Sequence, residues 1–380
     1  MDLRRKKLAM QYLAKLKSYP SNPAFGIIYH PPNSELFDRR PNVIPTLGLR
    51  MREPIQNLTP PITLITKTET HENPPWLIEK PKIDLSLTKF KKGNLEPHIF
   101  RTLFNELREA YGECGAIFTH GSKIDEKVGC ACAYRHKTIS RRLPDGCSIF
   151  TAELQAILLA LLAVKESRKK KFIICSDSKS ALQALNKMKV NIPLVSKSLK
   201  LLQELRARQV DITFVWVPSH VGIGGNEAAD REAKKALQKE VTATSIPYTD
   251  LKHSIASASY REWQARWETE SYNKLFNIHN KVTQQSTCRG STRHKDSILT
   301  RLKIGHTYLT HSFILRGEEP PQCIGCNCSL TVEHLLIHCV DFQDIRRKYF
   351  SVPGLKVLYQ TVDAEVICRF VGEIGLLTKC

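Results

Sequence analysis

The sequence predicts a mixed α/β fold for the middle of the chain, on two observations. Three short stretches rich in β-forming residues, Cys114–Thr119, Val128–Tyr134 and Thr138–Leu143, follow one another. Apolar strand patterns and helical patterns then alternate as far as Leu237. Antiparallel strands followed by β-α alternation are typical of a mixed sheet with helices against its faces.

The elements after the third strand can be assigned in order. "FTAELQAILLALLAVKES" is an apolar helix with Thr151 as a candidate N-cap, and "KFIICSDS" is a buried strand with polar residues at its end. "KSALQAL" and Leu194–Arg208 are predicted helices, and "DITFVWVPSH" is a strand that runs into a loop. "NEAADREAKKAL" is a helix with Asn226 as its predicted cap.

Composition divides the rest of the chain. Residues 20–97 hold thirteen of the twenty prolines, and proline removes backbone donors and disfavours helix in the residue before it. The predicted domains are a basic amphipathic helix at 1–20, a proline-rich and largely irregular linker at 21–111, the α/β domain at 112–239 and a mostly helical region at 240–380.

The basic start, "MDLRRKKLAMQYLAKL", is predicted to form a helix with Leu8, Tyr12, Leu13 and Leu16 on one face. A mitochondrial transit peptide is the alternative for this segment.

Two features are expected in the C-terminal region. Trp263 and Trp267 lie one turn apart on a predicted helix, which favours core packing. Residues 298–317 are predicted to form another helix, and Lys281–Lys295 a polar loop between the two.

The formal net charge of +20 favours a polyanionic partner, with nucleic acid ahead of anionic membrane. A basic surface that only aids solubility is the alternative. No run of about 18 apolar residues occurs, so no membrane span is expected. No leader pattern opens the chain, so the twelve cysteines are expected to be reduced thiols or metal ligands.

Three acids stand where a site would form. Glu153 is in the first turn of a helix, Asp177 follows a buried strand, and Asp230 is near the start of the last helix. Strand ends and helix starts converge on one rim of such a sheet. Carboxylates gathered there repel one another unless a hard cation such as Mg²⁺ lies between them. Taken singly, each acid is equally explained as a helix-end or surface residue.

The motifs "FTHGS", "TAELQAI", "CSDSKSAL" and "WVPSHVGIGGNEAADREAKKA" resemble, in order and spacing, those of type 1 ribonuclease H domains. The resemblance covers Cys114 to Leu237. It implies a five-stranded mixed sheet of order 3-2-1-4-5 and endonucleolytic hydrolysis of the RNA strand in RNA–DNA hybrids. It also implies two Mg²⁺ ions held by four carboxylates, of which the first bridges both ions. Glu153, Asp177 and Asp230 match three of the four metal ligands. His220 matches the histidine that handles protons on a mobile loop.

The fourth position departs from the family pattern, because His120 stands where the first acid is expected. Imidazole is neutral or positive near pH 7 and suits Zn²⁺ or Mn²⁺ better than Mg²⁺. Asp125 is expected in the turn between strands, away from the rim. Weak or absent Mg²⁺-dependent activity is therefore expected, with Mn²⁺ as the alternative metal.

Two other functions stay open. A non-catalytic nucleic-acid-binding protein would keep the fold and the basic surface without a working site. An exonuclease or integrase of the same fold is the other, and the "PSHVGIGGNEAAD" block argues against it.

The flanks, "PPWLIEKPKIDLSL" and the tail from "LTRLKIGHTYLTHSF" onward, resemble the region after the reverse transcriptase in Jockey-like non-LTR retrotransposon polyproteins. A C-terminal fragment of such a polyprotein is the corresponding expectation. Its RNA–DNA hybrids favour an intracellular location, in the nucleus or cytoplasm.

A second metal site is predicted in "CIGCNCSLTVEHLLIHC". Cys323, Cys326, His334 and Cys339 have the spacing of a zinc knuckle with a Cys₃His ligand set, over residues 323–339. Four protein ligands would make this Zn²⁺ structural. Cys328 and His338 are further candidates, and a cluster of reduced cysteines without metal is the alternative.

Overall fold

The computed structural model separates into two compact units, Met1–Ser257 and Ala258–Cys380, each described below by itself. The residues that the structure describes are 2–31, 34–39, 42–56, 64–68, 74, 77–90, 93, 95–241, 245–282 and 292–377.

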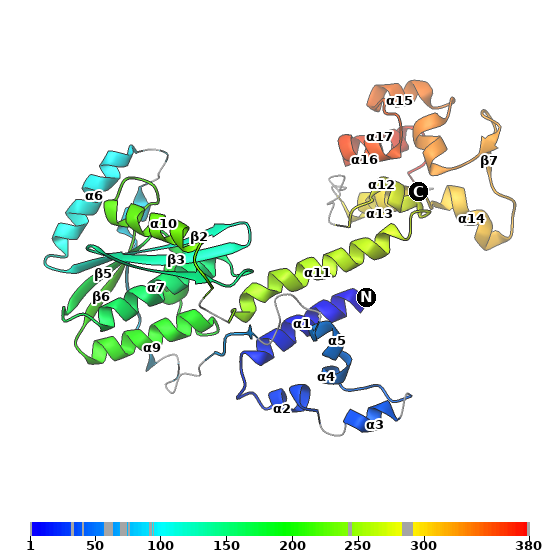
Figure 1. The fold of residues 1–380 in the computed structure, drawn as a ribbon. Helices are drawn as coiled ribbons and strands as arrows, with labels where there is room; N and C mark the ends of the chain where they lie inside the picture. Colours follow the sequence, from blue (N-terminus) through cyan, green and yellow to red (C-terminus); the bar gives the residue numbers. More distant parts are fainter. Residues whose placement is uncertain are drawn as a thin grey trace. The chain divides into compact units, whose positions relative to one another are not determined.

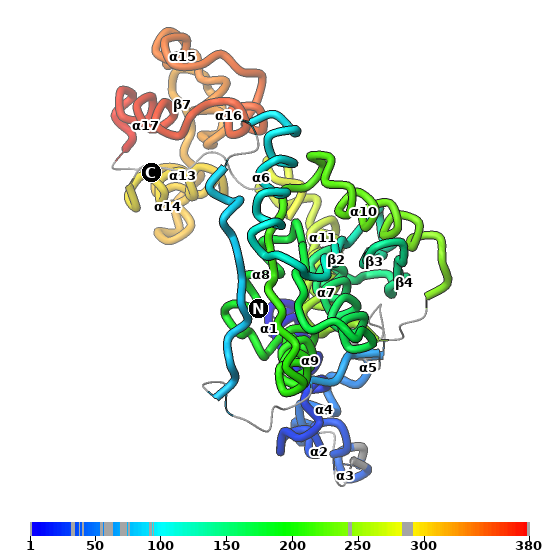
Figure 2. Tube along the Cα trace, turned by 90° about the vertical axis from the view of Figure 1, so that its left-hand side faces the viewer, coloured from blue at the N-terminus to red at the C-terminus, as the bar shows by residue number. Residues whose placement is uncertain are grey.

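The first unit is built on a six-stranded sheet in the order β1-β6-β5-β2-β3-β4 (Figure 1). β2, β3 and β4 form an antiparallel meander, whereas β5 and β6 run parallel to β2. Figure 2, turned by 90° from Figure 1, shows β2, β3 and β4 side by side. The strands are β1 Lys82–Asp84, β2 Gly115–Ile124, β3 Lys127–Tyr134, β4 Lys137–Leu143, β5 Lys171–Ser176 and β6 Asp211–Trp216.

The expected five-stranded sheet is corrected to six strands. β1 comes from the proline-rich region and pairs in parallel with β6, with Ile83 opposite Phe214. β1 is thus an edge strand that lies outside the region of family resemblance, Cys114 to Leu237. The five strands within residues 112–239 are neighbours in the order β4-β3-β2-β5-β6.

Helices cover both faces of this sheet. α7 (Ile149–Lys165) and α9 (Pro193–Ala207) lie on one face, and α6 (Pro97–Ala110) and α10 (Gly224–Ala236) lie on the other (Figure 1). The alternation of β2 explains both layers, because successive side chains point to opposite faces of a strand. Ile117 belongs to the apolar cluster around α7. Phe118 belongs to the cluster with Phe104 of α6 and Ala229 of α10.

The predicted helix caps differ from the observed ones. Ser148, not Thr151, caps α7, since its hydroxyl accepts a hydrogen bond from the Thr151 N–H at 3.2 Å. Asp250 holds this cap in place through bonds to the Ser148 N–H and hydroxyl, both 2.9 Å. α10 begins at Gly224 without a side-chain cap, and Asn226 is buried within its first turn.

The N-terminal helix is present, but its buried face is not the expected one. α1 (Asp2–Lys17) buries Met10, Leu13, Ala14 and Leu16. Leu8 and Tyr12, expected on that face, are exposed.

The proline-rich region holds more regular structure than its composition led us to expect. It contributes β1 and the amphipathic α6, whose Phe100 is fully buried against the sheet. The other elements are α2 Ala24–Tyr29, α3 Ser34–Asp38, α4 Leu47–Arg50, α5 Arg52–Gln56 and the 3₁₀ helix Ser86–Lys89; α8, after β5, is Lys179–Asn186.

The second unit is mostly helical around its own apolar cluster, which includes Leu302, Leu336 and Phe370. Gly305, with φ 78°, ends α13, so the helix expected over residues 298–317 is split in two. α11, Tyr248–Glu268, begins in the first unit and ends in the second. The other elements of the second unit are α12 Lys274–Ile278, α13 Arg293–Ile304, α14 Tyr308–Arg316, β7 Gln322–Cys323, β8 Cys328–Ser329, the π-helix His334–His338, α15 Gln343–Tyr349, α16 Leu355–Thr361 and α17 Ala364–Glu373.

The two tryptophans of α11 have different environments. Trp267 contacts the Phe276 ring at a centroid distance of 5.7 Å and donates to the His279 carbonyl at 2.7 Å. Trp263 is 47% exposed and stacks on Tyr260, so the core packing predicted for it is wrong. Much of the loop predicted at Lys281–Lys295 lies outside the described residues, and α13 begins within that range.

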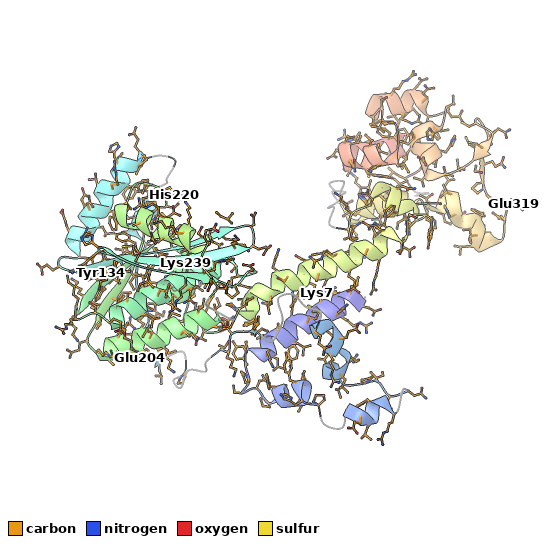
Figure 3. The ribbon with its side chains drawn as sticks, viewed as in Figure 1. Lys7, Tyr134, Glu204, His220, Lys239 and Glu319 are labelled. Carbon is orange, nitrogen blue, oxygen red and sulfur yellow. The ribbon has the colours of Figure 1, made fainter. Side chains whose placement is uncertain are left out.

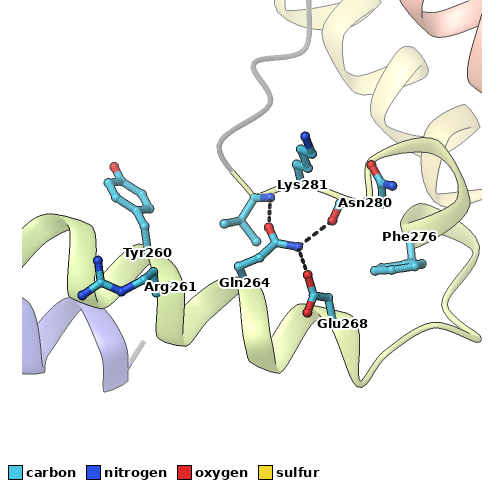
Figure 4. Close-up of a pocket in the computed structure, with 8 residues that line it drawn as sticks. Tyr260, Arg261, Gln264, Glu268, Phe276, Asn280 and Lys281 are labelled. Carbon is cyan, nitrogen blue, oxygen red and sulfur yellow. Dashed lines mark hydrogen bonds between the residues drawn. The ribbon is translucent and has the colours of Figure 1, made fainter.

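A pocket of ≈370 Å³ lies beside the last turns of α11 (Figure 4). Gln264 fixes its wall: its amide donates to Glu268 and to the Asn280 carbonyl and accepts from the Val282 N–H. Every polar atom of this amide is thus used in holding the chain segment against the helix.

Candidate active site

The fold brings the four singled-out rim residues together. His120 is in the middle of β2, Asp177 directly follows β5, Glu153 is in the second turn of α7, and Asp230 is in the middle of α10. One ligand atom each from His120, Glu153 and Asp177 lie within 4.8 Å of one another. Asp230 reaches the same place from the other face of the sheet, through His120.

His120 lies between two of the acids. Its Nδ1 is 3.2 Å from Asp177 Oδ2, and its Nε2 is 3.1 Å from Asp230 Oδ1. All three side chains are largely buried, with 13% of His120 and 7% of each carboxylate exposed. The imidazole ring therefore links the carboxylates that a shared cation would otherwise bring together.

The acids around His120 raise its pKa above the ordinary value. Burial acts to lower that pKa, but the hydrogen bond to Asp177 and the charges of Asp177, Glu153 and Asp230 outweigh it. The protonated ring is therefore the favoured partner of the two aspartates.

Glu153 is 6% exposed, and its Oε2 has no hydrogen-bond partner among the described residues. Burial, together with the charge of Asp177, raises the pKa of Glu153 to about 8. A buried carboxylate oxygen without a partner is costly unless a proton or a cation satisfies it. Gly121 permits this close approach, because a Cβ there would meet the Glu153 backbone nitrogen at 2.8 Å.

The loop before α10 carries His220 (Figure 3), which lies near Asp230 of the rim. His220 is exposed, has φ 53°, and can place a ring nitrogen within 4.8 Å of carboxylate oxygens of Glu227 and Asp230. Glu227 Oε1 also accepts a hydrogen bond from the Gly222 N–H at 3.2 Å, which anchors the loop to the helix.

Sequence reasoning missed two residues of this rim. Glu227 lies three positions before Asp230 and Lys234 four positions after it, which puts all three on one face of α10. Lys234 donates to Asp230 Oδ2 at 2.7 Å. Helical spacing around Asp230 was the signal that would have identified them.

Gly222, Gly224 and Gly225 predict a flexible loop after His220, but Gly222 and Gly225 have separate structural roles. Gly222 has φ 79°, a value that side-chain-bearing residues rarely adopt. Gly225 is inside α10, where its missing side chain allows the Phe118 ring to approach. Asp125 lies in the β2–β3 turn with φ 52° and is exposed, as expected.

Residues 113–238 match the family model described as RNase H. This part of the chain is a ribonuclease H domain. The match covers the whole sheet except β1, together with the four rim residues and the His220 loop. By family, a ribonuclease H domain is a hydrolase of the nuclease class that binds nucleic-acid hybrids. Ribonuclease H domains use divalent metals.

The donor atoms of this ribonuclease H domain fit one divalent cation. Glu153 supplies an oxygen without a partner, Asp177 a second carboxylate, and His120, once its ring has lost its proton, a nitrogen within the same 4.8 Å. They do not fit a pair of cations bridged at position 120, because a neutral or positive ring stands there instead of a carboxylate.

The second unit gathers the predicted zinc ligands. Cys323, Cys326, His334 and Cys339 each offer a ligand atom within 4.8 Å of the others. The Cys339 sulfur is 3.8 Å from that of Cys323 and 3.9 Å from that of Cys326. Ligands at about 2.3 Å in a tetrahedron are roughly 3.8 Å apart, so this spacing suits Zn²⁺.

Two nearby candidates lie outside this set of four. Cys328 Sγ is 3.3 Å from His334 Nδ1, and Cys328 pairs with Cys323 across the short β7–β8 ladder. His338 is not in the group. Two hydrogen bonds hold this set in place. The Val340 N–H donates to Cys326 Sγ, and the Arg346 side chain donates to the Cys339 carbonyl.

No helix among the described residues is long and apolar enough to cross a bilayer.

Proposed function

We propose that the ribonuclease H domain acts on the RNA strand of RNA–DNA hybrids and that His120 leaves this copy with little or no Mg²⁺-dependent cleavage. The family of residues 113–238 and the net charge of +20 support this substrate class. The metal ligands in this proposal are Glu153, Asp177 and Asp230, with His120 in the place of the first acid. A bound divalent cation would activate water and stabilise the leaving oxygen.

In this proposal, other residues of the chain bind the hybrid and move protons. Lys and Arg side chains hold the phosphates of the hybrid. The 2′-hydroxyls in the minor groove distinguish RNA from DNA. His220 moves protons on its exposed loop, and Glu227 keeps that loop near Asp230 through the bond to the Gly222 N–H.

The observation that supports the impairment is the position of the His120 ring. Its two nitrogens lie 3.2 Å and 3.1 Å from oxygens of Asp177 and Asp230. The ring therefore contacts carboxylate oxygens that a cation would need as ligands. Lys234 occupies the other oxygen of Asp230 at 2.7 Å. Both carboxylates therefore already lie within ion-pair distance of basic protein groups.

The same contacts favour a second function, in which the protein binds nucleic acid without cutting it. Asp177 and Asp230 already contact His120 and Lys234 without a metal, and the basic charge that attracts nucleic acid does not depend on the rim.

Cleavage of a labelled RNA–DNA hybrid with Mg²⁺ and, separately, with Mn²⁺ tests these proposals. The parent is compared with His120→Asp and with His120→Asp/Asp177→Asn. We expect the single variant to cut with Mg²⁺ at least about 100-fold faster than the parent, a change equivalent to about 2.7 kcal/mol in the barrier. The double variant is expected to be inactive, which ties any activity to this rim and not to a contaminating nuclease.

The outcomes separate the two functions. Equal cleavage by the parent and His120→Asp would contradict the impairment. Cleavage by the parent with Mn²⁺ alone would make His120 a metal ligand. Binding of the hybrid by all three proteins, with cleavage only by the single variant, would leave this copy a binding protein.

We also propose that Cys323, Cys326, His334 and Cys339 hold a structural Zn²⁺. The chain is further proposed to derive from a Jockey-like non-LTR retrotransposon, on the resemblance of its flanks. A genomic context with an adjoining reverse transcriptase reading frame would test that origin.

A further inference from the structure

A polar cavity lies on the first unit, away from the acidic rim. It has a volume of ≈420 Å³ and opens where the start of β2 and the end of β3 meet α6 and α10. Tyr134, at the end of β3, is one of its lining residues (Figure 3).

The lining of this cavity is positively charged. Arg108 of α6, Arg135 of the β3–β4 turn and Lys169 of the turn before β5 all line it, and no aspartate or glutamate does. Within the described part of the chain, no carboxylate forms an ion pair with any of the three. Three cations from separate segments repel one another, so an anion between them is favoured.

Local packing keeps the cavity open at its floor. A Cβ at Gly225 would meet the Phe118 ring at 2.1 Å, whereas a Cβ at Gly224 would meet nothing within 4 Å. The first turn of α10 therefore lies directly on the sheet while its outer side stays open. α10 is 13 residues long and has no side-chain cap, so its start adds partial positive charge to that of the three side chains.

The cavity and the His120 side chain of the rim lie on the same face of β2. Ala116 and Phe118 line the cavity, and His120 continues the same alternation. Four residues of strand span about 13 Å. B-form DNA advances about 3.4 Å per base pair, so on that scale this distance corresponds to roughly four base pairs.

We infer that Arg108, Arg135 and Lys169 form a binding site for one backbone phosphate of the nucleic acid that the domain engages, about four base pairs from the rim. This inference rests on the proposed function, because it takes a hybrid as the ligand. The guanidinium of Arg135 lies 5.4 Å from the Tyr134 ring centroid, which restricts its position before the phosphate arrives.

Binding of a labelled 18-base-pair RNA–DNA hybrid, measured by fluorescence anisotropy over a range of salt without Mg²⁺ or Mn²⁺, tests the site. The variant is Arg108→Gln/Arg135→Gln/Lys169→Gln. The control is Arg168→Gln/Arg208→Gln/Lys200→Gln, which removes two arginines and one lysine outside the cavity. Arg168 is the immediate neighbour of Lys169 and is exposed.

We expect the cavity variant to weaken binding at least tenfold at low salt and to reduce the slope of log affinity against log salt by about one. The control, with the same loss of charge, should change affinity less than threefold. Replacing single phosphates by neutral methylphosphonates should identify one linkage whose loss weakens the parent and has no further effect on the cavity variant. Thermal unfolding checks that both variants fold.

Equal weakening by the variant and the control would show a general charge effect and overturn the site, while the proposed function would stand. Calorimetric binding of inorganic phosphate in the micromolar range, with hybrid binding unchanged in the cavity variant, would assign the cavity to free phosphate and overturn its nucleic-acid role. No hybrid binding by the parent at any salt concentration would overturn the site and the proposed function together.

Discussion

At the scale of single residues, one side chain departs from the carboxylates expected at the rim of the ribonuclease H domain. His120 places a ring between Asp177 and Asp230, and Glu153 keeps an oxygen without a partner beside it. The three acids and His220 could be identified from motif spacing alone. The sequence could not show that the imidazole hydrogen-bonds Asp177 and also lies 3.1 Å from Asp230, because that depends on how β2, β5 and α10 converge in space.

The buried Glu153 makes the stability of the first unit depend on pH. Its pKa is raised to about 8 in the folded protein from an ordinary value of 4.5. The folded state therefore holds the proton more tightly than the unfolded state, and stability falls as pH rises from about 4.5 through about 8.

Glu153→Gln removes this dependence, since glutamine does not titrate. Between pH 5 and pH 8 we expect the stability of the variant relative to the parent to rise by on the order of 3 kcal/mol, measured by urea unfolding without added divalent cations. Glu166→Gln, an exposed position at the end of the same helix, is the control. A constant difference between Glu153→Gln and the parent across this range would contradict the buried, proton-retaining state of Glu153.

At the scale of elements, α10 is the helix that joins the two sites of the domain. Its start lines the basic cavity, its middle carries Asp230, and Glu227 ties it to the His220 loop. The sequence predicted this helix but not its start, because two glycines without a side-chain cap are a poor helix signal. The contact between Gly225 and Phe118, which favours helix there, joins residues more than a hundred positions apart.

The neighbouring glycines at the start of α10 allow a matched test of that contact. Gly225→Ala puts a Cβ 2.1 Å from the buried Phe118 ring, and overpacking of this kind costs about 1–3 kcal/mol of stability. Gly224→Ala meets nothing within 4 Å and should be neutral or stabilising by up to about 1 kcal/mol. Chemical unfolding measures the stability of both variants. Equal stabilities would show that the folding of α10 does not depend on the close contact between Gly225 and the Phe118 ring.

At the scale of the whole molecule, the chain has two compact units with separate apolar cores and separate candidate metal sites. The Cys/His spacing predicted the second site, whereas the split of the long predicted helix at Gly305 was missed. Glycine within a helical pattern lowers the expected stability only modestly, so the pattern alone did not reveal that Gly305 adopts a left-handed conformation.

Metal analysis of the purified chain should find about one zinc per molecule. Removal of zinc by a strong chelator should destabilise the second unit, because a four-coordinate site contributes directly to folding. Cys339→Ser should lose the metal, while Cys328→Ser, outside the set of four, should retain it. Zinc loss on Cys328→Ser but not on Cys339→Ser would replace the assigned ligand set.

The pairing of β1 with β6 has a consequence for where the independently folding unit begins. A fragment cut at residue 113 would leave the backbone groups of β6 exposed along one side, and such edges invite intermolecular pairing. It would also lose the contacts of Phe100 and Phe104 with the sheet and the bond from Lys82 to Asp211. We expect residues 113–238 alone to aggregate, and residues 1–257, which keep the whole core of the first unit, to remain monodisperse in size-exclusion chromatography. Equal solution behaviour of the two fragments would mean that the segment before the family boundary is dispensable for the fold.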